Sequence, residues 1–398
     1  IIRAVYSSSN GLEKRPKLRF PGFDEPYKQC RIGDIYAERS QRGASDMELL
    51  SVTMNDGVKP RSEIEGKDNS SEDKSNYKIV RKGDMVYNSM RMWQGANGIS
   101  PCDGIVSPAY TVLMPKQEIN NGYFAALFKS ANLINEFRKN SQGMTSDTWN
   151  LKYPQIETIK VQIPSVSEQD KVSEMFSVLD ERIAAQSRLV ESLKKYKRGL
   201  LSQLIAQKKA FDTSGEWKTV KLGHIFKERT ERAKGNETLL AVTISNGVQR
   251  RDEIDLKDNS SDDKSNYKCV YIGDIAYNTM RMWQGASGVS PYNGIVSPAY
   301  TIVTPIRPDL HNMTFWAYYF KYSPLVQTFQ KYSQGLTSDT WNLKFPQFSE
   351  IAVTMPPISE QDKIAECLSV FDEHCKCEDE KLQALLQVRT SLLQQLFI

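Results

Sequence analysis

Two nearly identical stretches of the chain carry side chains that could read the bases of a nucleic acid. The first, NSMRMWQG at residues 88–95, supplies Asn88, Arg91, Trp93 and Gln94. Arginine can form two hydrogen bonds with guanine, asparagine and glutamine can do so with adenine, and an aromatic ring can pack on a sugar or a base. The copy at residues 278–285 supplies Asn278, Arg281, Trp283 and Gln284.

A second pair of stretches adds hydroxyl groups and a carboxylate. Residues 143–150 read GMTSDTWN, and residues 335–342 repeat them with one change. Such groups suit phosphate contacts or acceptance of a hydrogen bond from cytosine. The candidate residues here are Thr145, Ser146 and Trp149, with Thr337, Ser338 and Trp341 in the copy. In the alternative interpretation, Met90, Met92 and Trp93 belong to a hydrophobic core and only Arg91 and Gln94 are free.

Basic residues upstream of these stretches are candidate phosphate contacts. They are Lys59, Arg61, Lys67, Lys74 and Lys78 in the first half, and Arg250, Arg251, Lys257, Lys264 and Lys268 in the second. Residues 57–91 hold eight Lys or Arg against six Asp or Glu, and residues 247–281 hold six against seven. Neither loop alone is a strong phosphate patch, so a DNA ligand would need further charges from the folded surface or from partner subunits.

Nothing in the sequence indicates a catalytic centre built on histidine. There are three histidines, and neither His224 nor His311 has a histidine at the matching position of the other half. His374 lies close to Cys375 and Cys377, but helical positions i, i+1 and i+3 do not converge on one metal ion. Because Cys375 falls on an apolar helix seam, we interpret it as a small buried residue.

Recognisable cofactor motifs are missing as well. The sequence contains no GxGxxG after a strand, no GxxxxGK[ST], and no Asn/Asp-Pro-Pro-aromatic tetrapeptide of the kind that adenine methyltransferases use. Carboxylate-x-Lys triplets at residues 65–67 and 255–257 could suggest a nuclease, but they lie in highly charged loops without a paired upstream carboxylate. We therefore expect no catalytic residue, no bound metal and no cofactor in this chain.

An internal repeat, displaced by 190 to 192 residues, organises the chain. KDNSSEDKSNYK at residues 67–78 returns as KDNSSDDKSNYK at residues 257–268, and SQGMTSDTWNL at residues 141–151 returns as SQGLTSDTWNL at residues 333–343. This period is the size of a domain with a connector, so we expect two similar modules related by pseudo-two-fold symmetry. Such symmetry suits duplex DNA, while a duplication that serves stability alone is the alternative.

Composition limits the class of protein without naming a function. The 398 residues are 39% hydrophobic and 25% charged, with a net charge of +4. No stretch is apolar enough for a membrane span, no secretory leader is evident, and six cysteines in so long a chain form no disulfide framework. We expect a reducing, cytoplasmic location. Residues 1–16 lack periodicity and are treated as an N-terminal tail.

Each half is predicted to contain a mixed α/β module followed by one long helix. Short apolar runs such as residues 79–80, 85–87 and 110–113 predict strands, and residues 124–137 with their copy 316–329 predict one helix per module. Ser167 and Ser359 are candidate N-caps of the long helices, with an aspartate three residues later. Each long helix should run for about 40 residues, or ~60 Å at 1.5 Å per residue.

Both long helices carry a heptad seam with two polar interruptions at equivalent positions. The first seam is Val172, Phe176, Leu179, Ile183, Val190, Leu193, Leu200 and Leu204, with Gln186 and Lys197 at the polar places. The second is Ile364, Leu368, Phe371, Cys375, Leu382, Leu385, Leu392 and Leu396, with Glu378 and Arg389 at the polar places. We expect the two helices to pack antiparallel as a rod between the modules, rather than each on its own module alone.

The order of these features resembles the specificity subunit of type I restriction-modification systems. The resemblance rests on PKLRFPGF at residues 16–23, on SEQDK at residues 167–171 and 359–363, and on the apolar steps that follow. The MRMWQGA run together with GIVSPAY also resembles one class of target-recognition domain. The implied domains are two target-recognition domains at residues 17–165 and 209–357, and two conserved helices at residues 166–208 and 358–398. The implied fold class is α+β, with the helices forming an antiparallel coiled coil.

The resemblance implies a non-catalytic DNA reader, in which each recognition domain reads one half of a bipartite site. In such systems two modification subunits carry S-adenosylmethionine and methylate adenine N6, and restriction subunits use ATP and Mg. This chain departs from the family pattern because its two recognition domains are nearly identical, which predicts two similar inverted half-sites.

Two other functions stay open at this stage. A self-contained nuclease or methyltransferase would be active as the purified chain with Mg²⁺ or a methyl donor. A coiled-coil scaffold without DNA readout would show no sequence-selective binding even with modification subunits present.

Overall fold

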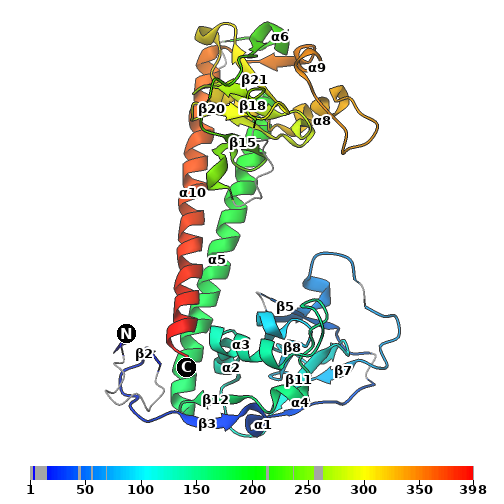
Figure 1. Cartoon of the computed structure of the whole chain (residues 1–398), viewed down its shortest axis with the longest axis vertical. Helices are drawn as coiled ribbons and strands as arrows, with labels where there is room; N and C mark the ends of the chain where they lie inside the picture. The colour runs from blue at the N-terminus through cyan, green and yellow to red at the C-terminus, as the bar shows by residue number, and fades with distance from the viewer. Residues whose placement is uncertain are drawn as a thin grey trace. The chain divides into compact units, whose positions relative to one another are not determined.

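The computed structural model describes residues 3–4, 16–43, 46–54, 57–68, 70–211, 215–235, 237–254 and 263–397. Their contacts divide the chain into two compact units (Figure 1). Unit 1 comprises Ile1–Ser187 and Glu380–Ile398, and unit 2 comprises Arg188–Asp379. Each unit therefore holds one module, the first part of the helix that follows it, and the last part of the other long helix.

The module of unit 1 combines short strands with short helices, as expected for a mixed α/β fold. A two-residue pair, β1 (Arg3–Ala4) with β2 (Leu18–Arg19), precedes it. Its strands are β3 (Lys28–Arg31), β4 (Tyr36–Glu38), β5 (Leu50–Thr53), β6 (Gly57–Pro60), β7 (Lys78–Val80), β8 (Met85–Asn88), β9 (Asn97–Ile99), β10 (Gly104–Val106), β11 (Tyr110–Pro115) and β12 (Lys160–Ile163). Its helices are α1 (Ile32–Ile35), α2 (Asn121–Leu127), α3 (Ala131–Asn140) and α4 (Tyr153–Ile156), with 3-10 turns η1 (Arg61–Glu63) and η2 (Met92–Gln94).

An antiparallel sheet in the order β4-β11-β8-β9 separates two apolar cores. Because alternate side chains of a strand point to opposite faces, Met85 and Tyr87 of β8 enter one core whereas Val86 enters the other. The second core also receives Val112 of β11, which lies opposite Val86 in the sheet. The strands predicted at residues 79–80, 85–87 and 110–113 are thereby confirmed as parts of β7, β8 and β11.

The prediction of one helix over residues 124–137 is wrong, because two helices occupy this stretch. α2 ends at Leu127, and α3 begins after Ser130, whose hydroxyl accepts a hydrogen bond from the Leu133 amide at 3.4 Å. Ser130 is therefore an N-cap that interrupts the apolar periodicity. The copy divides in the same way, into α7 (Met313–Tyr319) and α8 (Ser323–Tyr332).

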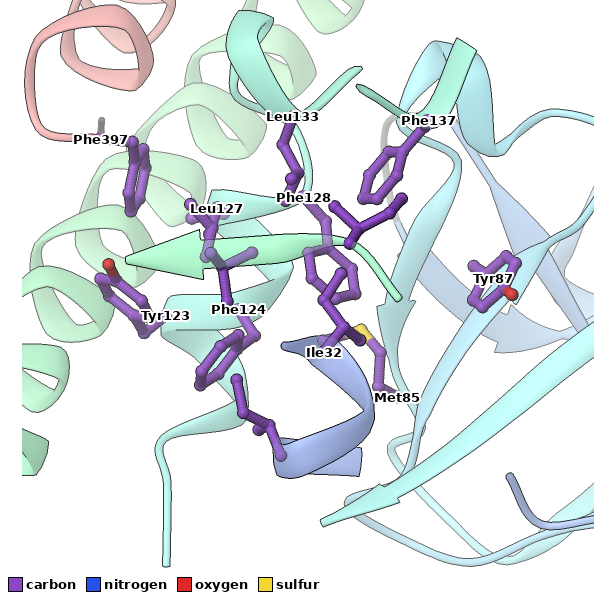
Figure 2. Close-up of a cluster of buried hydrophobic side chains, with 14 of the residues drawn as sticks. Ile32, Met85, Tyr87, Tyr123, Phe124, Leu127, Phe128, Leu133, Phe137 and Phe397 are labelled. Carbon is purple, nitrogen blue, oxygen red and sulfur yellow. The ribbon is translucent and has the colours of Figure 1, made fainter. Parts of the chain in front are cut away.

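Figure 2 shows the larger core of unit 1, which also takes in the end of the chain. Phe124 and Phe128 of the α2 segment pack edge-on, and Phe128 packs in the same way on Phe137 of α3. Phe397 lies beside Tyr123, with ring centroids 5.4 Å apart. Residues at and just after the end of the second long helix thus contribute to the core of the first module.

Unit 2 repeats this topology, with the four-stranded order β14-β21-β18-β19. Its strands are β13 (Lys218–Lys221), β14 (Phe226–Glu228), β15 (Leu240–Thr243), β16 (Gly247–Arg250), β17 (Lys268–Val270), β18 (Ile275–Asn278), β19 (Ser287–Val289), β20 (Gly294–Val296), β21 (Tyr300–Pro305) and β22 (Ala352–Met355). Besides α7 and α8 it contains α6 (Leu222–Ile225), α9 (Phe345–Ser349), and 3-10 turns η3 (Arg251–Glu253), η4 (Met282–Gln284) and η5 (Pro308–Leu310).

The long helices are α5 (Val166–Ile205) and α10 (Ile358–Gln395), within the predicted ranges 166–208 and 358–398. Ser167 and Ser359 are not the N-caps, because both helices begin one residue before them. At α5 the Ser165 carbonyl accepts from the amides of Glu168 and Gln169 at 3.1 and 3.0 Å, which makes Ser165 the last residue outside the helix. The predicted N-caps therefore lie inside the first turn.

Buried side chains of the SEQDK motif fix each long helix to its module. Gln169 donates to the Pro164 carbonyl and accepts from the Asn120 amide, both at 3.0 Å. Glu168 forms a buried pair with Arg19, with two hydrogen bonds of 2.8 Å. The copy keeps the glutamine contacts through Gln361, while Glu360 accepts from the indole of Trp217 at 3.0 Å.

The seam is confirmed, since every predicted seam residue of both helices is buried or partly buried. In unit 1, Phe176 stacks on Phe397, and Asp180 pairs with Arg389. In unit 2, Lys194 pairs with Asp379 at 3.2 Å, and Lys197 pairs with Asp372.

Within each unit, residues that come later in α5 contact residues that come earlier in α10, so the two helices run antiparallel there. The alternative in which each helix packs on its own module alone is wrong, although each helix also enters its own module's core. Val172 of α5 contributes to the core of unit 1, and Ile364 of α10 contributes to that of unit 2.

Replacing Gln169 with alanine should destabilise unit 1. The change removes the amide side chain that bonds both the Pro164 carbonyl and the Asn120 amide, at a site that is 1% exposed. We expect the free energy of unfolding to fall by about 1–3 kcal/mol, measured by urea unfolding followed by circular dichroism. Lys171→Ala is the matched control on the same turn, and losing its exposed pair with Glu174 should cost less than about 0.5 kcal/mol. Equal losses in the two variants would contradict the anchoring role of the glutamine.

Candidate nucleic-acid interface

The predicted loop at residues 88–95 is a surface turn with a fixed backbone. Asn88, at the end of β8, accepts a hydrogen bond from the Met90 amide at 3.0 Å, and the Trp93 indole donates to the Met90 carbonyl at 3.1 Å. Gly95 ends η2 with φ of 85°, a conformation that favours glycine. Residues 278–285 repeat these contacts at the same distances.

Burial divides the loop into core and surface residues. Met92 is fully buried and Trp93 partly so, whereas Met90, Arg91 and Gln94 are exposed. The interpretation that all three apolar residues belong to the core is therefore right for Met92 and wrong for Met90. Within the described part of the chain, neither Arg91 nor its copy Arg281 has an ion-pair partner.

The second predicted loop closes on itself. Gln142 and Asn150 pair through both backbone hydrogen bonds, at 3.0 and 2.8 Å. Inside this pair the Thr148 hydroxyl donates to the Thr145 carbonyl at 2.9 Å, and a Cβ on Gly143 would lie 2.6 Å from the Thr148 carbonyl oxygen. Only glycine fits there, at φ of 143°, so the loop has a defined shape with exposed Thr145 and Ser146.

A tryptophan pair joins the two loops, which lie far apart in the sequence. The rings of Trp93 and Trp149 meet edge to face with centroids 5.2 Å apart, and the Leu151 amide donates to the Ser89 carbonyl at 2.8 Å. Trp283 and Trp341 form the same pair at the same distance. The structure thus brings together the two segments that the sequence singled out.

A lysine that the sequence analysis missed ties a third segment to these loops. Lys321, which follows α7, donates to the carbonyls of Ile244, in the turn after β15, and of Gly285. Burial, together with a smaller effect of the positive charge of Lys197, lowers the pKa of Lys321 to about 8. Lys129 occupies the equivalent place and donates to the Met54 carbonyl at 3.4 Å. Its recurrence in both halves was the signal available in the sequence.

One charged residue distinguishes the two interfaces. The guanidinium of Arg138 lies over the Trp93 ring, 5.7 Å from its centroid, and adds a cation beside the tryptophan pair. Its counterpart in the second half is Gln330. The two loop pairs are therefore alike in shape, but the cation over Trp93 has no counterpart at the equivalent position of the second half.

Several predicted phosphate contacts have structural partners instead of a free surface position. The Lys78 ammonium donates to Glu38 at 3.1 Å and to the Tyr110 carbonyl at 2.8 Å, and its copy Lys268 does the same with Glu228 and Tyr300. With Lys78 only 7% exposed, we exclude both lysines from the candidate DNA contacts.

The other basic residues upstream of the loops occupy varied positions. The Arg61 side chain holds its own loop, donating to the carbonyls of Ile64, Gly66 and Lys67 at 2.6 to 2.9 Å. Arg250 lies over the Tyr292 ring, with 5.1 Å from its guanidinium to the centroid. Lys67 is exposed, and the partly buried residues are Lys59, Lys74, Arg251 and Lys264. Lys257 lies outside the described residues. DNA contact at these positions stays a prediction.

Among the described residues, no group of three or more His, Cys, Asp or Glu side chains is placed to hold a metal ion. Cys375 is buried in the helix seam, as predicted, and Cys377 is exposed. In the same part of the chain, no helix has the length and hydrophobicity needed to cross a membrane.

Comparison with solved structures shows the fold of known relatives. The S subunit of a type I restriction-modification system from M. genitalium is 15% identical and superposes with a TM-score of 0.59, over 97% of this chain and 99% of its own. A chain from a structural study of complex assembly and conformational transition in the type I R-M system is also 15% identical. Its TM-score is 0.56, over 93% of this chain and 97% of that one.

A family model described as the type I restriction modification DNA specificity domain matches the sequence twice, at residues 25–195 and 214–387. The two matches fall on the two halves of the internal repeat and cover most of the chain. The chain therefore belongs to the family of type I restriction modification DNA specificity domains and contains two copies of that domain.

Proposed function

We propose that this chain is the non-catalytic specificity subunit of a type I restriction-modification complex and reads two similar, inverted half-sites of a bipartite DNA target. The observation that carries the proposal is the duplicated loop pair. Each half presents an exposed Arg and Gln beside a tryptophan pair, on a backbone fixed by the same hydrogen bonds. Preorganised side chains of this kind suit base readout, because little conformational freedom is lost on binding.

The small net charge of the chain supports the idea that other subunits contribute to DNA binding. A net charge of +4 over 398 residues is small for a protein that binds DNA alone. We infer that modification subunits supply part of the phosphate contact, carry S-adenosylmethionine and methylate adenine N6. Restriction subunits that use ATP and Mg would join the same complex.

The long helices offer repeated surfaces for such partners. Val178 of α5 and Val370 of α10 occupy equivalent repeat positions and are 62% and 60% exposed. Tyr196 and Val388 form a second equivalent pair of exposed apolar residues. Equivalent apolar positions on the two helices support the docking of two identical modification subunits, one for each half.

The target should consist of two nearly identical inverted half-sites around an unread spacer. The loops at residues 87–95 and 277–285 differ only at Ser89 and Thr279, and both of these side chains are buried. Methylation-sensitive sequencing of a host that carries the system would give the target directly. Two unrelated half-sites would contradict the proposal that both loop pairs read bases in the same way.

Arg91→Ala and Arg281→Ala should each cost ~1–3 kcal/mol of specific binding and relax recognition in one half-site only. The reason is that an arginine paired with a base discriminates, whereas one paired with a phosphate weakens all sequences alike and lowers the salt dependence. Competition binding with specific and random duplexes at several salt concentrations measures both effects.

Lys171→Ala is the matched control for these two variants, because it removes one exposed positive charge from α5. This variant should change the affinity for the specific duplex and for the random duplex by the same factor. If both arginine variants keep full specific affinity, the loops are structural and base readout lies elsewhere.

The shared length of α5 and α10 should set the spacer between half-sites. Deleting residues 186–192 together with 378–384 removes one heptad from each helix and preserves both seams. The deleted segments lie between Asp180 and Lys197 of α5 and between Asp372 and Arg389 of α10, so the pairs that these residues form are retained. Each helix shortens by ~10 Å, which corresponds to about three base pairs at ~3.4 Å per pair.

Methylome profiling of this deletion variant should show the same half-sites with a spacer shorter by roughly two to four base pairs, the range allowing for the rotation left by seven residues of a 3.6-residue helix. An unchanged spacer in an active variant would show that something other than the helices sets the distance. Altered half-site sequences would show that the helices take part in base readout.

A further inference from the structure

The tips of the two closed loops carry fully exposed apolar side chains. Met144 is 99% exposed and Leu336, its counterpart in the second half, is 101% exposed. No other large apolar side chain among the described residues is as exposed, and the next, Ile272, reaches 66%. A single exposed apolar side chain is common on proteins, so it is the recurrence of full exposure at the same place in both halves that points to an apolar partner.

The exposure belongs to a loop of defined shape. Met144 lies between Gly143, which packs against Thr148, and Thr145. The Thr145 amide is held in place because it donates to the Thr148 hydroxyl at 3.1 Å. Leu336 has the same surroundings, with the Thr337 amide donating to Thr340 at 3.1 Å. The loop therefore holds the side chain outward in the unbound protein.

The charge of the loop disfavours contact with the sugar-phosphate backbone. Residues 142–150 contain Asp147 and no lysine or arginine, and residues 334–342 contain Asp339 and likewise none. A carboxylate next to phosphates is repelled, whereas in a groove it can accept a hydrogen bond from the amino group of cytosine. An apolar tip beside a carboxylate thus matches the interior of a groove better than its edge.

The loop is also fixed to the residues proposed for base readout. Trp149 ends the loop and packs on Trp93, next to exposed Arg91. On the neighbouring loop Met90 is 40% exposed, and its copy Met280 is 42% exposed. If the tip served to dock a protein, it would not need to lie on the same loop pair as the residues proposed for base readout.

We propose that Met144 and Leu336 are specificity-determining residues that contact the apolar surface of bases within the two half-sites. Two features of DNA offer that surface, the methyl group of thymine in the major groove and the face of a base at an opened step. Both side chains are long and unbranched at Cβ, so they can enter a narrow gap. The inference rests on the proposed function, because it places the loop pair on DNA.

The test uses the full chain co-purified with the modification subunits of its system, and duplexes selected by the wild-type complex from a random pool. Met144→Ser and Leu336→Ser should weaken binding to the selected duplex about ten-fold each, while binding to random duplex and its salt dependence stay unchanged. The exchange variants Met144→Leu and Leu336→Met, which copy the other half, should stay within about two-fold of the wild type.

Modified duplexes then identify the apolar surface. If the tip contacts a thymine methyl, deoxyuridine in place of that thymine weakens binding of the wild type and not of the serine variant. If the tip enters an opened step, 2-aminopurine at that step brightens on binding of the wild type and stays dim with the serine variant. Either result supports the proposal and assigns the source.

Three results would overturn it. Serine variants that keep full specific affinity show that the tips touch no base. An equal loss of affinity for selected and random duplexes assigns the tips to sequence-independent DNA binding. Loss of the co-purified modification subunits assigns them to a protein contact. A wild-type complex that selects no sequence refutes the proposed function itself, whereas normal selection with unaffected serine variants refutes only the role of the tips.

Discussion

The structure depends on the way in which each module's hydrophobic core is closed by the far end of the other module's helix. Leu396 and Phe397, at the end of the chain, pack in unit 1, while Leu204 and Ile205, at the end of α5, pack in unit 2. Neither module can complete its core from its own contiguous sequence. The antiparallel pairing of α5 and α10 is therefore a requirement of folding, and the buried glutamines of the two SEQDK motifs fix where each helix leaves its module.

Comparison of the two halves separates what the fold needs from what the loops do. Buried positions have changed between the copies, for example Tyr36 to Phe226 and Phe124 to Trp316, and the buried Arg19 pair is replaced by the Trp217 indole. Tyr to Phe nearly keeps the side-chain volume, and the larger Trp316 ring is accommodated by neighbours that also differ between the copies, such as Tyr123 and Phe315. By contrast, the exposed loop residues Arg91, Gln94, Thr145 and Ser146, which belong to neither core, are identical in the copy. Retention of exposed polar residues alongside drift in the core argues that the loops are kept for contact with a ligand and not for stability.

Much of this architecture was predictable, because periodicity and repetition are properties of the sequence itself. The helix seams, the mixed modules and the recurrence of the candidate loops at equivalent positions of the two halves followed from repetition and spacing. Features that depend on tertiary contacts did not. Lys78 binds Glu38, 40 residues away, and Lys321 contacts a turn 77 residues away. Neither partner is visible from local sequence, and each changes the role of the lysine. The break at Ser130 was a local signal that the apolar periodicity obscured, because the amide that Ser130 caps, that of Leu133, is three residues away.

Two of the charge pairs between α5 and α10, those of Asp180 and Asp372, add a preference for the antiparallel direction more than they add stability. Asp180 and Asp372 are each 49% exposed, so their pairs with Arg389 and Lys197 contribute about 0.2–1 kcal/mol apiece, far less than the apolar seam. If the duplicated helices packed parallel and in register, equivalent positions would meet, and Lys197 would face Arg389 across the seam. Antiparallel packing instead sets each cation beside an aspartate. The apolar residues make the helices associate, closure of the two cores requires the antiparallel arrangement, and the charge pairs favour it further.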